Sequence, residues 1–564
     1  MGASVVALCL LPASCTSSTE RLPPAQAAID GFIAAWSAGD WSTVASMMGG
    51  APRVRRIERW YERQLKDGEV VSFDVRRTGT VAQPEPGDPP RTTASYTITY
   101  VSVAADAPVS LTGTLELSLD EDTDTWTVGW TRGSLWPGID GAAGFDVVVR
   151  WSRRGEILDA SGRRLAAGSG RHRRYAFGVR GGTTLGHLAP LPRSELKGAH
   201  PLREAGDLVG ASGIEEAFET RLAGQPAARL VATDRRGRAV EVLGRAAPRP
   251  GKPVRSTLDA DVQRAAEAAF GSTVGGALAV DPSTGKILAV VSSSPFDPNN
   301  YVGVAGIEPF NRALSGLYPP GSSLKAMTAA AALDSGRVTP ATRLTGPQEY
   351  KGVRNFESGE FGTIDFATAL RHSVNTAFAQ VAEKLGARRL TRYAESFGFN
   401  QTPDTAIDAA DSSFPFPKDE GDLLWGSIGQ AQVLATPLQM ATIAAAIANG
   451  GVRMEPRIAR SEPKSGERVI RRRTARTLTR LMEGVVEGGT GTAARISGVR
   501  VAGKTGTAEV DVAGERRNHA WFICFAPVGA PKVAIAVVSE YGGVGGQVAA
   551  PIARSILTSV LPLL

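Results

Sequence analysis

The segment Pro319-Pro320-Gly321-Ser322-Ser323-Leu324-Lys325, with the alanine-rich run that follows it to Leu333, is the most informative stretch of this 564-residue chain. Prolines and a glycine precede the run and Gly336 follows it, which are start and stop signals of a helix. On a helix, Ser322 and Lys325 share one face. A serine hydroxyl needs a neighbouring base to act as a nucleophile, and a lysine with a lowered pKa can be that base. The segment therefore predicts a nucleophilic serine.

The pattern S-x-x-K alone is weak, because three other pairs in the chain match it. These pairs lie in turns or beside prolines, which do not favour a helix that would align the two side chains. Ser322 and Lys325 are therefore preferred over Ser194/Lys197, Ser283/Lys286 and Ser461/Lys464.

Two further strings follow in a fixed order. Ser373-Val374-Asn375 is the one S-x-N string of the sequence, and Lys504-Thr505-Gly506 is a K-T-G string, with a second match at Lys464-Ser465-Gly466. S-x-x-K, S-x-N and K-T-G in this order are close to a signature of serine acyl-transfer enzymes. The order favours Lys504 over the earlier lysine.

Each string can supply a different part of one site. A second cation at Lys504 would lower the pKa of Lys325. Ser373 could relay a proton to a leaving amine, and Asn375 could bind a substrate amide. The helix start at Ser322 offers N–H groups to a developing oxyanion. Hydroxyls beside Lys504 suit a substrate carboxylate, at Thr505 and Thr507.

From about residue 154 onward the chain resembles a class B high-molecular-weight penicillin-binding protein, a D,D-transpeptidase of peptidoglycan. The three strings carry the resemblance. Further similar segments are Arg154-Gly155-Glu156-Ile157-Leu158-Asp159 with Gly162 and Leu165-Ala166, Gly213-Ile214-Glu215, Thr257-Leu258-Asp259 through Gln263, and His519-Ala520-Trp521-Phe522.

The resemblance implies a reaction on stem peptides without metal or cofactor. Ser322 would attack the penultimate D-alanine carbonyl and release D-alanine, and a neighbouring stem's amine would take the acyl group. The backbone N–H groups of Ser322 and Thr507 would form the oxyanion hole, and β-lactams would acylate the serine. The implied catalytic residues are Ser322, Lys325, Ser373 and Lys504, and the implied substrate-binding residues are Asn375, Thr505, Gly506 and Thr507.

Composition supports a globular protein of about three domains, at roughly 100–200 residues each. Three cysteines and five histidines give no disulfide framework or metal-ligand spacing, and His372 and His519 are expected to be wall residues. The net charge of +7 includes arginine-rich runs at 171–174, 235–238 and 471–473. No nucleic-acid motif accompanies them, so solvated faces near anionic membrane or wall polymer explain them.

The N-terminus resembles a bacterial lipoprotein processing site. An apolar stretch over 5–11 precedes Pro12-Ala13-Ser14-Cys15, so lipidation is expected at Cys15, with an export signal or a membrane anchor as the alternative. No later stretch approaches the ~18 apolar residues of a membrane span. We therefore expect an extracytoplasmic enzyme tethered to the outer face of the cytoplasmic membrane.

The following residues predict two helices, at 25–48 with a break at Gly39-Asp40 and at 53–66, and then strands at 70–76, 92–103, 111–119 and 125–132. This order resembles the cone-shaped, nuclear-transport-factor-like (NTF2-like) domain that precedes some class B enzymes. The expected organisation is a signal or anchor at 1–22, the NTF2-like domain at 23–140, a pedestal or dimerisation domain at 141–255 and a transpeptidase domain at 256–564.

The last domain is expected to be mixed α/β with an antiparallel sheet, similar to the serine β-lactamase fold. A helix at 259–270, a hairpin at 277–280 and 286–291, late strands at 520–525 and 533–540, and a closing helix at 551–561 predict a sheet built from both ends of the segment. The K-T-G string is expected on an inner strand.

Three other functions remain open from the sequence. A β-lactamase would need a deacylating base, and the Glu-x-x-Leu-Asn string of class A is absent. A D,D-carboxypeptidase would use water as acceptor, and an inactive β-lactam-binding scaffold would have lost a motif residue. Expected partners are stem peptides, β-lactams, a glycan-polymerising synthase and other cell-wall assembly proteins.

Overall fold

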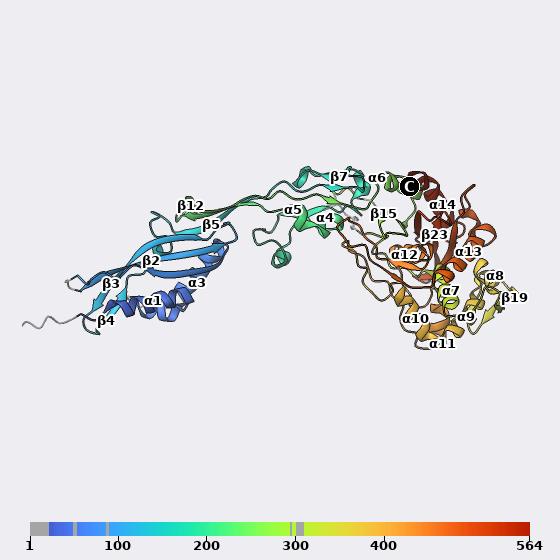
Figure 1. The fold of residues 1–564 in the computed structure, drawn as a ribbon, viewed down its shortest axis with the longest axis horizontal. Helices are drawn as coiled ribbons and strands as arrows, with labels where there is room; N and C mark the ends of the chain where they lie inside the picture. The colour runs from blue at the N-terminus through green and yellow to red at the C-terminus, as the bar shows by residue number, and fades with distance from the viewer. Residues whose placement is uncertain (1–21, 49–53, 86–88, 294–295, 300–309) are drawn as a thin grey trace, which may run out of the picture. The chain divides into compact units, whose positions relative to one another are not determined.

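The computed structural model describes residues 22–48, 54–85, 89–293, 296–299 and 310–564. The expected lipidation residue, Cys15, lies outside them. The chain divides into two compact units (Figure 1), one formed by Met1–Trp151 with Gln225–Arg249 and the other by Ser152–Gly224 with Pro250–Leu564. The expected middle domain, 141–255, is therefore shared between the two units.

The first unit packs helices against one face of an antiparallel sheet. Its helices are α1 (Ala25–Ala38), α2 (Trp41–Ser46) and α3 (Val54–Asp67), and its sheet has the order β1 (Val70–Thr78), β2 (Arg91–Ser102), β3 (Val109–Asp120) and β4 (Thr125–Val128). Gly39 ends α1 with a φ of 70°, and the Asp40 side chain caps α2. The two expected helices and four expected strands are all present, with ends shifted by a few residues.

Aromatic side chains fill the space between these helices and the sheet. Trp36 of α1 donates a hydrogen bond from Nε1 to the Tyr61 hydroxyl of α3 at 3.2 Å, and both are buried. A second, three-stranded antiparallel sheet completes the unit, with the order β12 (Ala239–Ala246), β11 (Ala227–Thr233) and β5 (Gly144–Arg150). The strand β5 also packs on α3, which joins this sheet to the helical layer.

The second unit begins with a region of short strands and short helices. Its elements are β6 (Ile157–Leu158), β7 (Arg164–Ala167), β8 (Arg174–Tyr175), β9 (Leu188–Pro190), β10 (Leu208–Gly210), α4 (Gly213–Ala217), α5 (Glu219–Ala223) and β13 (Val254–Arg255). A buried ion pair joins the chain before β6 to α4, since Arg154 Nε donates to Glu215 Oε2 at 2.8 Å. Arg173 bonds the other oxygen of the same carboxylate. The Arg-Gly and Gly-Ile-Glu segments therefore hold this region together.

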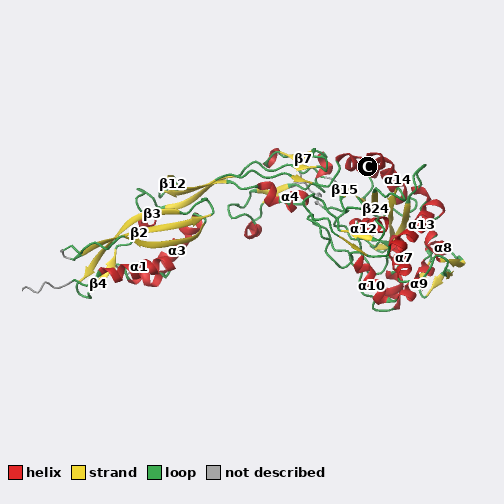
Figure 2. Cartoon of the chain, viewed as in Figure 1, coloured by secondary structure: helices red, strands yellow, loops and turns green. Residues whose placement is uncertain are grey.

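A five-stranded antiparallel sheet forms the centre of the second unit (Figure 2). Its order is β15 (Ile287–Ser292), β14 (Gly275–Val280), β24 (Val533–Ser539), β23 (Glu515–Ala526) and β22 (Ala502–Val512). Strands from both ends of the segment thus meet in one sheet, as the sequence predicted.

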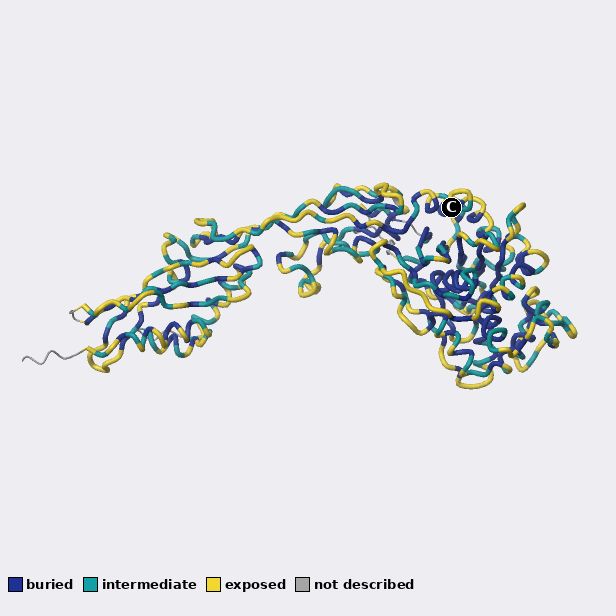
Figure 3. Tube along the Cα trace, viewed as in Figure 1, coloured by how far each residue is buried: buried dark blue, intermediate teal, exposed yellow. Residues whose placement is uncertain are grey.

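Helices cover both faces of this sheet, and the buried chain gathers around it (Figure 3). On one face lie α6 (Ala260–Phe270) and α14 (Ala549–Val560), and on the other lie α12 (Pro437–Ala448) and α13 (Arg472–Gly488). Alternate residues of β23 enter the two cores, with Phe522 and Cys524 on the first face and Trp521 and Ile523 on the second. This is the period of two that a strand buried on both faces requires.

The prediction of an inner strand for K-T-G was wrong, because β22 is an edge strand. In the described sheet β22 pairs with β23 alone, whereas β23 lies between β22 and β24. The eight residues from His519 to Ala526 are all buried, whereas β22 becomes polar and more exposed after Ala508. The more apolar strand takes the inner position, and Lys504 remains on the edge.

The remaining elements form a helical region beside the sheet. They are α7 (Lys325–Asp334), β16 (Arg343–Gly346), β17 (Glu349–Tyr350), β18 (Val353–Arg354), β19 (Gly362–Asp365), α8 (Phe366–Arg371), α9 (Asn375–Leu385), α10 (Ala387–Ser396), α11 (Glu420–Gly426), β20 (Val452–Met454) and β21 (Gly466–Arg468). In the part of the chain that the structure describes, none of the helices has the length and hydropathy needed to span a bilayer.

Candidate active site

Ser322 lies in the first turn of the helix that the sequence predicted. Residues Gly321–Leu324 form a 3-10 turn that leads directly into α7. Gly321 has a φ of 53°, and its N–H donates to Gly429 O at 2.8 Å. A Cβ on Gly321 would lie 2.7 Å from Thr507 O. The turn therefore sits against the free edge of β22, and Ser322 itself is half-buried.

Lys325 is fully buried, and its ammonium group contacts the second motif. Its Nζ donates to Ser373 O at 2.7 Å, to Ser373 Oγ at 3.2 Å and to Asn375 Oδ1 at 2.5 Å. The same Nζ lies 5.3 Å from the centre of the Phe378 ring. Three acceptor atoms lie within hydrogen-bond distance of this Nζ, so the side chain is held in one position.

Ser373 occupies a left-handed backbone conformation with a φ of 59°, between α8 and α9. This conformation is uncommon for a residue with a side chain and occurs often at functional sites. Here it directs both the carbonyl and the hydroxyl of Ser373 to Lys325. Asn375 begins α9, and its Nδ2 donates to Arg354 O at 2.8 Å.

Lys504 approaches the same hydroxyl from the edge strand. Its Nζ donates to Ser373 Oγ at 2.9 Å and to Thr505 O at 2.9 Å, and the side chain is fully buried. The hydroxyl of Ser373 therefore accepts from two lysines, and its own hydrogen stays available to a third group.

Burial disfavours the charged form of both lysines. Burial, with a contribution from the charge of Lys504, lowers the pKa of Lys325 well below its usual range. Burial lowers the pKa of Lys504 to about 7. A neutral Lys325 has a lone pair that can accept a proton, which is the property a general base needs.

The remaining K-T-G residues line the edge that faces the serine turn. A Cβ on Gly506 would lie 2.9 Å from Ser323 N, so only glycine permits this approach. Thr505 is buried, and Thr507 accepts a hydrogen bond at Oγ1 from Gly545 N at 3.2 Å.

All eight expected site residues thus lie in this region, in the 3-10 turn before α7, on α7, in the turn before α9, at the start of α9 and on β22. The decoy pairs are elsewhere: Ser194 and Lys197 lie in the 3-10 turn Arg193–Gly198, and Ser283 donates to Asp281 in the hairpin turn. His519 is buried, and its Nδ1 accepts from Tyr541 N at 3.2 Å.

Sequence reasoning missed three neighbours of the site. Phe378 lies near the ammonium of Lys325, and Trp521 Nε1 donates to Pro319 O at 3.0 Å, which fixes the chain before the serine. The third is Thr490, whose hydroxyl lies 2.6 Å from that of Thr505. A glycine-rich string, Gly488-Gly489-Thr490-Gly491, was the one sequence signal for it.

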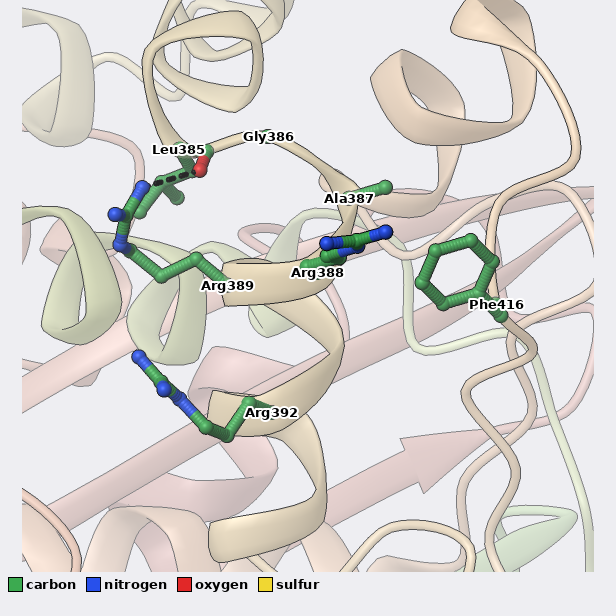
Figure 4. A pocket seen from close by; sticks show the side chains of 7 residues that line it. All are labelled: Leu385, Gly386, Ala387, Arg388, Arg389, Arg392 and Phe416. Carbon is green, nitrogen blue, oxygen red and sulfur yellow. Dashed lines mark hydrogen bonds between the residues drawn. The ribbon is translucent and has the colours of Figure 1, made fainter.

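A hollow of about 490 Å³ lies at the start of α10 (Figure 4), and none of the motif residues lines it. The arginines of α10 surround it, with Phe416 opposite Arg388. Arg389 Nη1 donates to Leu385 O at 2.7 Å. This hollow contains no group with the chemistry of the motif cluster.

A helix-borne serine and two buried lysines that meet at a second serine define a serine acyl-transfer enzyme. The family described as "Penicillin binding protein transpeptidase domain" matches residues 275–558, and the "Penicillin-binding Protein dimerisation domain" matches 167–256. The chain belongs to the penicillin-binding protein transpeptidase family.

Curated relatives agree with this membership. The chain is 37% identical over 364 residues to the peptidoglycan D,D-transpeptidase PbpA of Mycolicibacterium smegmatis, which covers 56% of this chain and 73% of the relative. It is 31% identical over 435 residues to the peptidoglycan D,D-transpeptidase MrdA of Acinetobacter baumannii, which covers 67% of this chain and 64% of the relative.

Solved structures show the same fold. Penicillin-binding protein A of Mycobacterium tuberculosis, as its ceftriaxone acyl-enzyme, has a TM-score of 0.60 at 31% identity and covers 73% of this chain and 98% of its own. Pseudomonas aeruginosa PBP2 in complex with WCK 5153 has a TM-score of 0.64 at 30% identity and covers 74% and 96%. The dimerisation and transpeptidase parts therefore have the fold of class B penicillin-binding proteins.

Proposed function

We propose that Ser322 is the nucleophile of a serine-type peptidoglycan D,D-transpeptidase that cross-links stem peptides. The activity is that of the family and of its curated relatives. The observation that carries the residue assignment is the meeting of Lys325 and Lys504 at the Ser373 hydroxyl. Two buried amines at one hydroxyl provide a base and a route for protons beside the serine turn.

In the acylation step, neutral Lys325 accepts the proton of Ser322 while the serine oxygen attacks the carbonyl of the penultimate D-alanine. N–H groups at the helix start, with that of Thr507, stabilise the oxyanion. The tetrahedral intermediate then collapses and its C–N bond breaks. The nitrogen of the departing D-alanine takes a proton through Ser373, and an acyl-serine remains.

In the second step, the amine of a neighbouring stem attacks the acyl-serine. The amine loses a proton to Lys325 by way of Ser373, the ester C–O bond breaks, and the Ser322 oxygen regains a proton. Over the two steps one peptide bond is broken and another is formed. The residues of the site can therefore carry out every proton transfer without an added co-reactant. Asn375 is assigned to a substrate amide.

The carboxylate of the donor stem is assigned to the edge strand. Lys504 provides positive charge there, and Thr505 and Thr507 provide hydroxyls. Gly506 allows the strand to approach the serine turn. A β-lactam carries an equivalent carboxylate beside its reactive carbonyl, which accounts for its acylation of Ser322.

The test is intact-protein mass after incubation with benzylpenicillin, on wild type, Ser322→Ala and Ser283→Ala. The last variant removes a serine from a decoy S-x-x-K string and is the matched control. We expect one persistent adduct in wild type and Ser283→Ala and none in Ser322→Ala. An adduct on Ser322→Ala would refute the nucleophile. Rapid adduct loss with hydrolysis of the antibiotic would favour a β-lactamase, and absence of any adduct in wild type would favour an inactive scaffold.

A separate experiment with a donor stem peptide tests whether an amine or water accepts the acyl group from the enzyme. Formation of a cross-linked product with an added amine acceptor supports transpeptidation. Release of D-alanine with only the shortened peptide, at any amine concentration, would instead indicate a D,D-carboxypeptidase.

We further assign the four-part organisation 1–22, 23–140, 141–255 and 256–564, with an NTF2-like first domain that acts as a spacer. Helices packed against a four-stranded antiparallel sheet support the NTF2-like assignment. The enzyme acts outside the cytoplasm, as peptidoglycan requires, with a glycan-polymerising synthase and cell-wall assembly proteins as partners. Its tether is a lipid on Cys15, and unchanged membrane partitioning of Cys15→Ala would refute this lipidation.

A further inference from the structure

Thr490 lies outside the three motifs, yet its side chain contacts one of them. It follows α13 in the string Gly488-Gly489-Thr490-Gly491. Its Oγ1 lies 2.6 Å from Oγ1 of Thr505, which is a short hydrogen bond between hydroxyls. Thr490 is exposed whereas Thr505 is 5% exposed. The contact therefore forms at the surface from which a ligand would approach the edge strand.

The backbone around Thr490 is fixed against the second motif. Thr490 N donates to Arg371 O at 3.2 Å, and Arg371 is two residues before Ser373. A Cβ on Gly489 would lie 2.2 Å from the same carbonyl oxygen. The segment after α13 thus packs directly on the turn of Ser373 while its side chain reaches the strand of Lys504.

A third segment encloses Thr490 from the other side. A Cβ on Gly546 would lie 2.5 Å from Thr490 O and 3.7 Å from Thr505 Cγ2. The loop after β24 therefore packs on both threonines. The backbone of Thr490 thus contacts Arg371 on one side and Gly546 on the other. In this position its hydroxyl has Thr505 as its only hydrogen-bond partner among the described residues.

The direction of this hydrogen bond determines what Thr505 can offer a ligand. A hydroxyl has one hydrogen and two acceptor lone pairs. Thr505 Oγ1 also lies 3.5 Å from the donor Lys504 Nζ. When Thr490 and Lys504 both donate to it, the Thr505 hydrogen is directed to the remaining side, and a carboxylate is an acceptor that uses it.

We propose that Thr490 is a positioning residue that orients the Thr505 hydroxyl toward the carboxylate of the donor stem or of a β-lactam. The proposal rests on the proposed function, in which Lys504 and Thr505 bind that carboxylate. It adds a residue from a fourth segment of the chain to the recognition of the substrate. A valine has the shape of threonine without the donor, so Thr490→Val removes the interaction and little else.

The test compares acylation rates for benzylpenicillin and for its methyl ester, which lacks the negative charge. The variants are Thr490→Val, Thr490→Ser, Thr505→Val and, as a matched control, Thr492→Val. Thr492 is an exposed threonine two residues away, and no motif residue in the described chain bonds its hydroxyl.

We expect Thr490→Val to slow acylation by benzylpenicillin roughly ten- to hundredfold, the size of a lost hydrogen bond to a charged group. Its rate with the ester should be unchanged. Thr490→Ser should restore the selectivity for the acid, and Thr492→Val should behave as wild type.

Two results would overturn the proposal. Equal slowing of acid and ester by Thr490→Val would show a general loosening of the site, and wild-type rates with both would show no role. The proposed function fails separately: if Thr505→Val keeps the wild-type ratio of acid to ester, then Thr505 does not bind the carboxylate, and the inference about Thr490 is wrong with it.

Discussion

Lys504 Nζ lies 2.9 Å from Ser373 Oγ, although 131 residues separate the two along the chain. The distance joins the edge strand of the sheet to the turn before α9. Lys325 reaches the same oxygen from α7 at 3.2 Å. One hydroxyl therefore connects three elements of the fold, and both side chains that donate to it are lysines.

Replacement of Lys325 by alanine should slow acylation by benzylpenicillin by several orders of magnitude, because residues that act as one unit fail together. Lys325→Arg should fail as well, since a guanidinium stays charged and cannot accept a proton. The measurement is the rate of adduct formation by intact mass. The control is Lys464→Ala, which replaces an exposed lysine of the second K-[ST]-G match and should react at the wild-type rate. A near-normal rate in Lys325→Ala would exclude Lys325 as the base.

The substitution Asn375→Asp should move the pH dependence of acylation. Asn375 Oδ1 accepts from Lys325 Nζ at 2.5 Å, and a carboxylate at this position favours the charged lysine and raises its pKa. Because the neutral lysine is the proposed base, the acylation rate at neutral pH should fall, and its rise should shift to higher pH. Acylation rates measured across pH test this shift.

Asn449→Asp is the matched control for that profile. Asn449 follows α12, and its Nδ2 donates to Val452 O at 3.0 Å, away from the motif residues. Its profile should overlay that of wild type. An Asn375→Asp profile that is lower at every pH without a shift would contradict the proposed electrostatic link.

Lys504 should make the stability of the protein depend on pH. Its pKa is lowered from 10.5 to about 7 by burial, so between these values the unfolded chain binds more protons than the folded one. The free energy of unfolding should therefore rise with pH over this window, by at most about 1.4 kcal/mol per pH unit from this residue. Below pH 7 the contribution should be constant.

Thermal midpoints of wild type and Lys504→Met, measured from pH 6 to 10, test this linkage. Wild type should gain stability relative to Lys504→Met as the pH rises above about 7. The exposed Lys464→Met should follow wild type. Parallel curves for wild type and Lys504→Met would show that the lysine does not titrate in this window.

Alanine substitution at two glycines with similar positive φ distinguishes the effect of backbone strain from the effect of a steric clash. Gly429 has a φ of 78°, and a Cβ there would lie 2.2 Å from Gly321 O; Gly336 has a φ of 69° and no atom within 4 Å of its Cβ position. Gly336→Ala should lower the free energy of unfolding by about 1–2 kcal/mol and leave acylation unchanged.

Gly429→Ala should lower both stability and the rate of acylation, because it must displace the turn of Ser322. Chemical denaturation and adduct formation measure the two effects on the same preparations. Equal acylation rates in the two variants would show that the contact of Gly429 with Gly321 does not position the serine.

Local signals in the sequence predicted much of this structure. Pro319-Pro320-Gly321 and Gly336 bound a helix because their conformations are set by few neighbours, and the Asp281–Gly285 turn predicts its hairpin for the same reason. The motif residues could be predicted because their chemistry requires specific side chains at specific spacings.

Long-range order was harder to predict. The position of β22 at the edge depends on which strand of its hairpin buries more apolar surface against helices distant in sequence. Thr490 was missed because a threonine beside glycines has no distinctive local pattern, and its partner Thr505 becomes visible only once α13 and β22 are packed together.

The route of the chain between its two units limits how the enzyme can be divided. A fragment that begins at Ser152 would keep β11 and β12 but lose β5, which leaves β11 with an unpaired edge that invites aggregation. Gln225 and Arg249 exchange backbone hydrogen bonds at 2.8 and 3.1 Å, so the chain leaves and re-enters at adjacent points. A short turn that joins Gly224 directly to Pro250 would therefore remove the β11–β12 hairpin from such a fragment. The second unit can be separated from the first only by removing two segments of the chain, because contacts and not chain order define the two units.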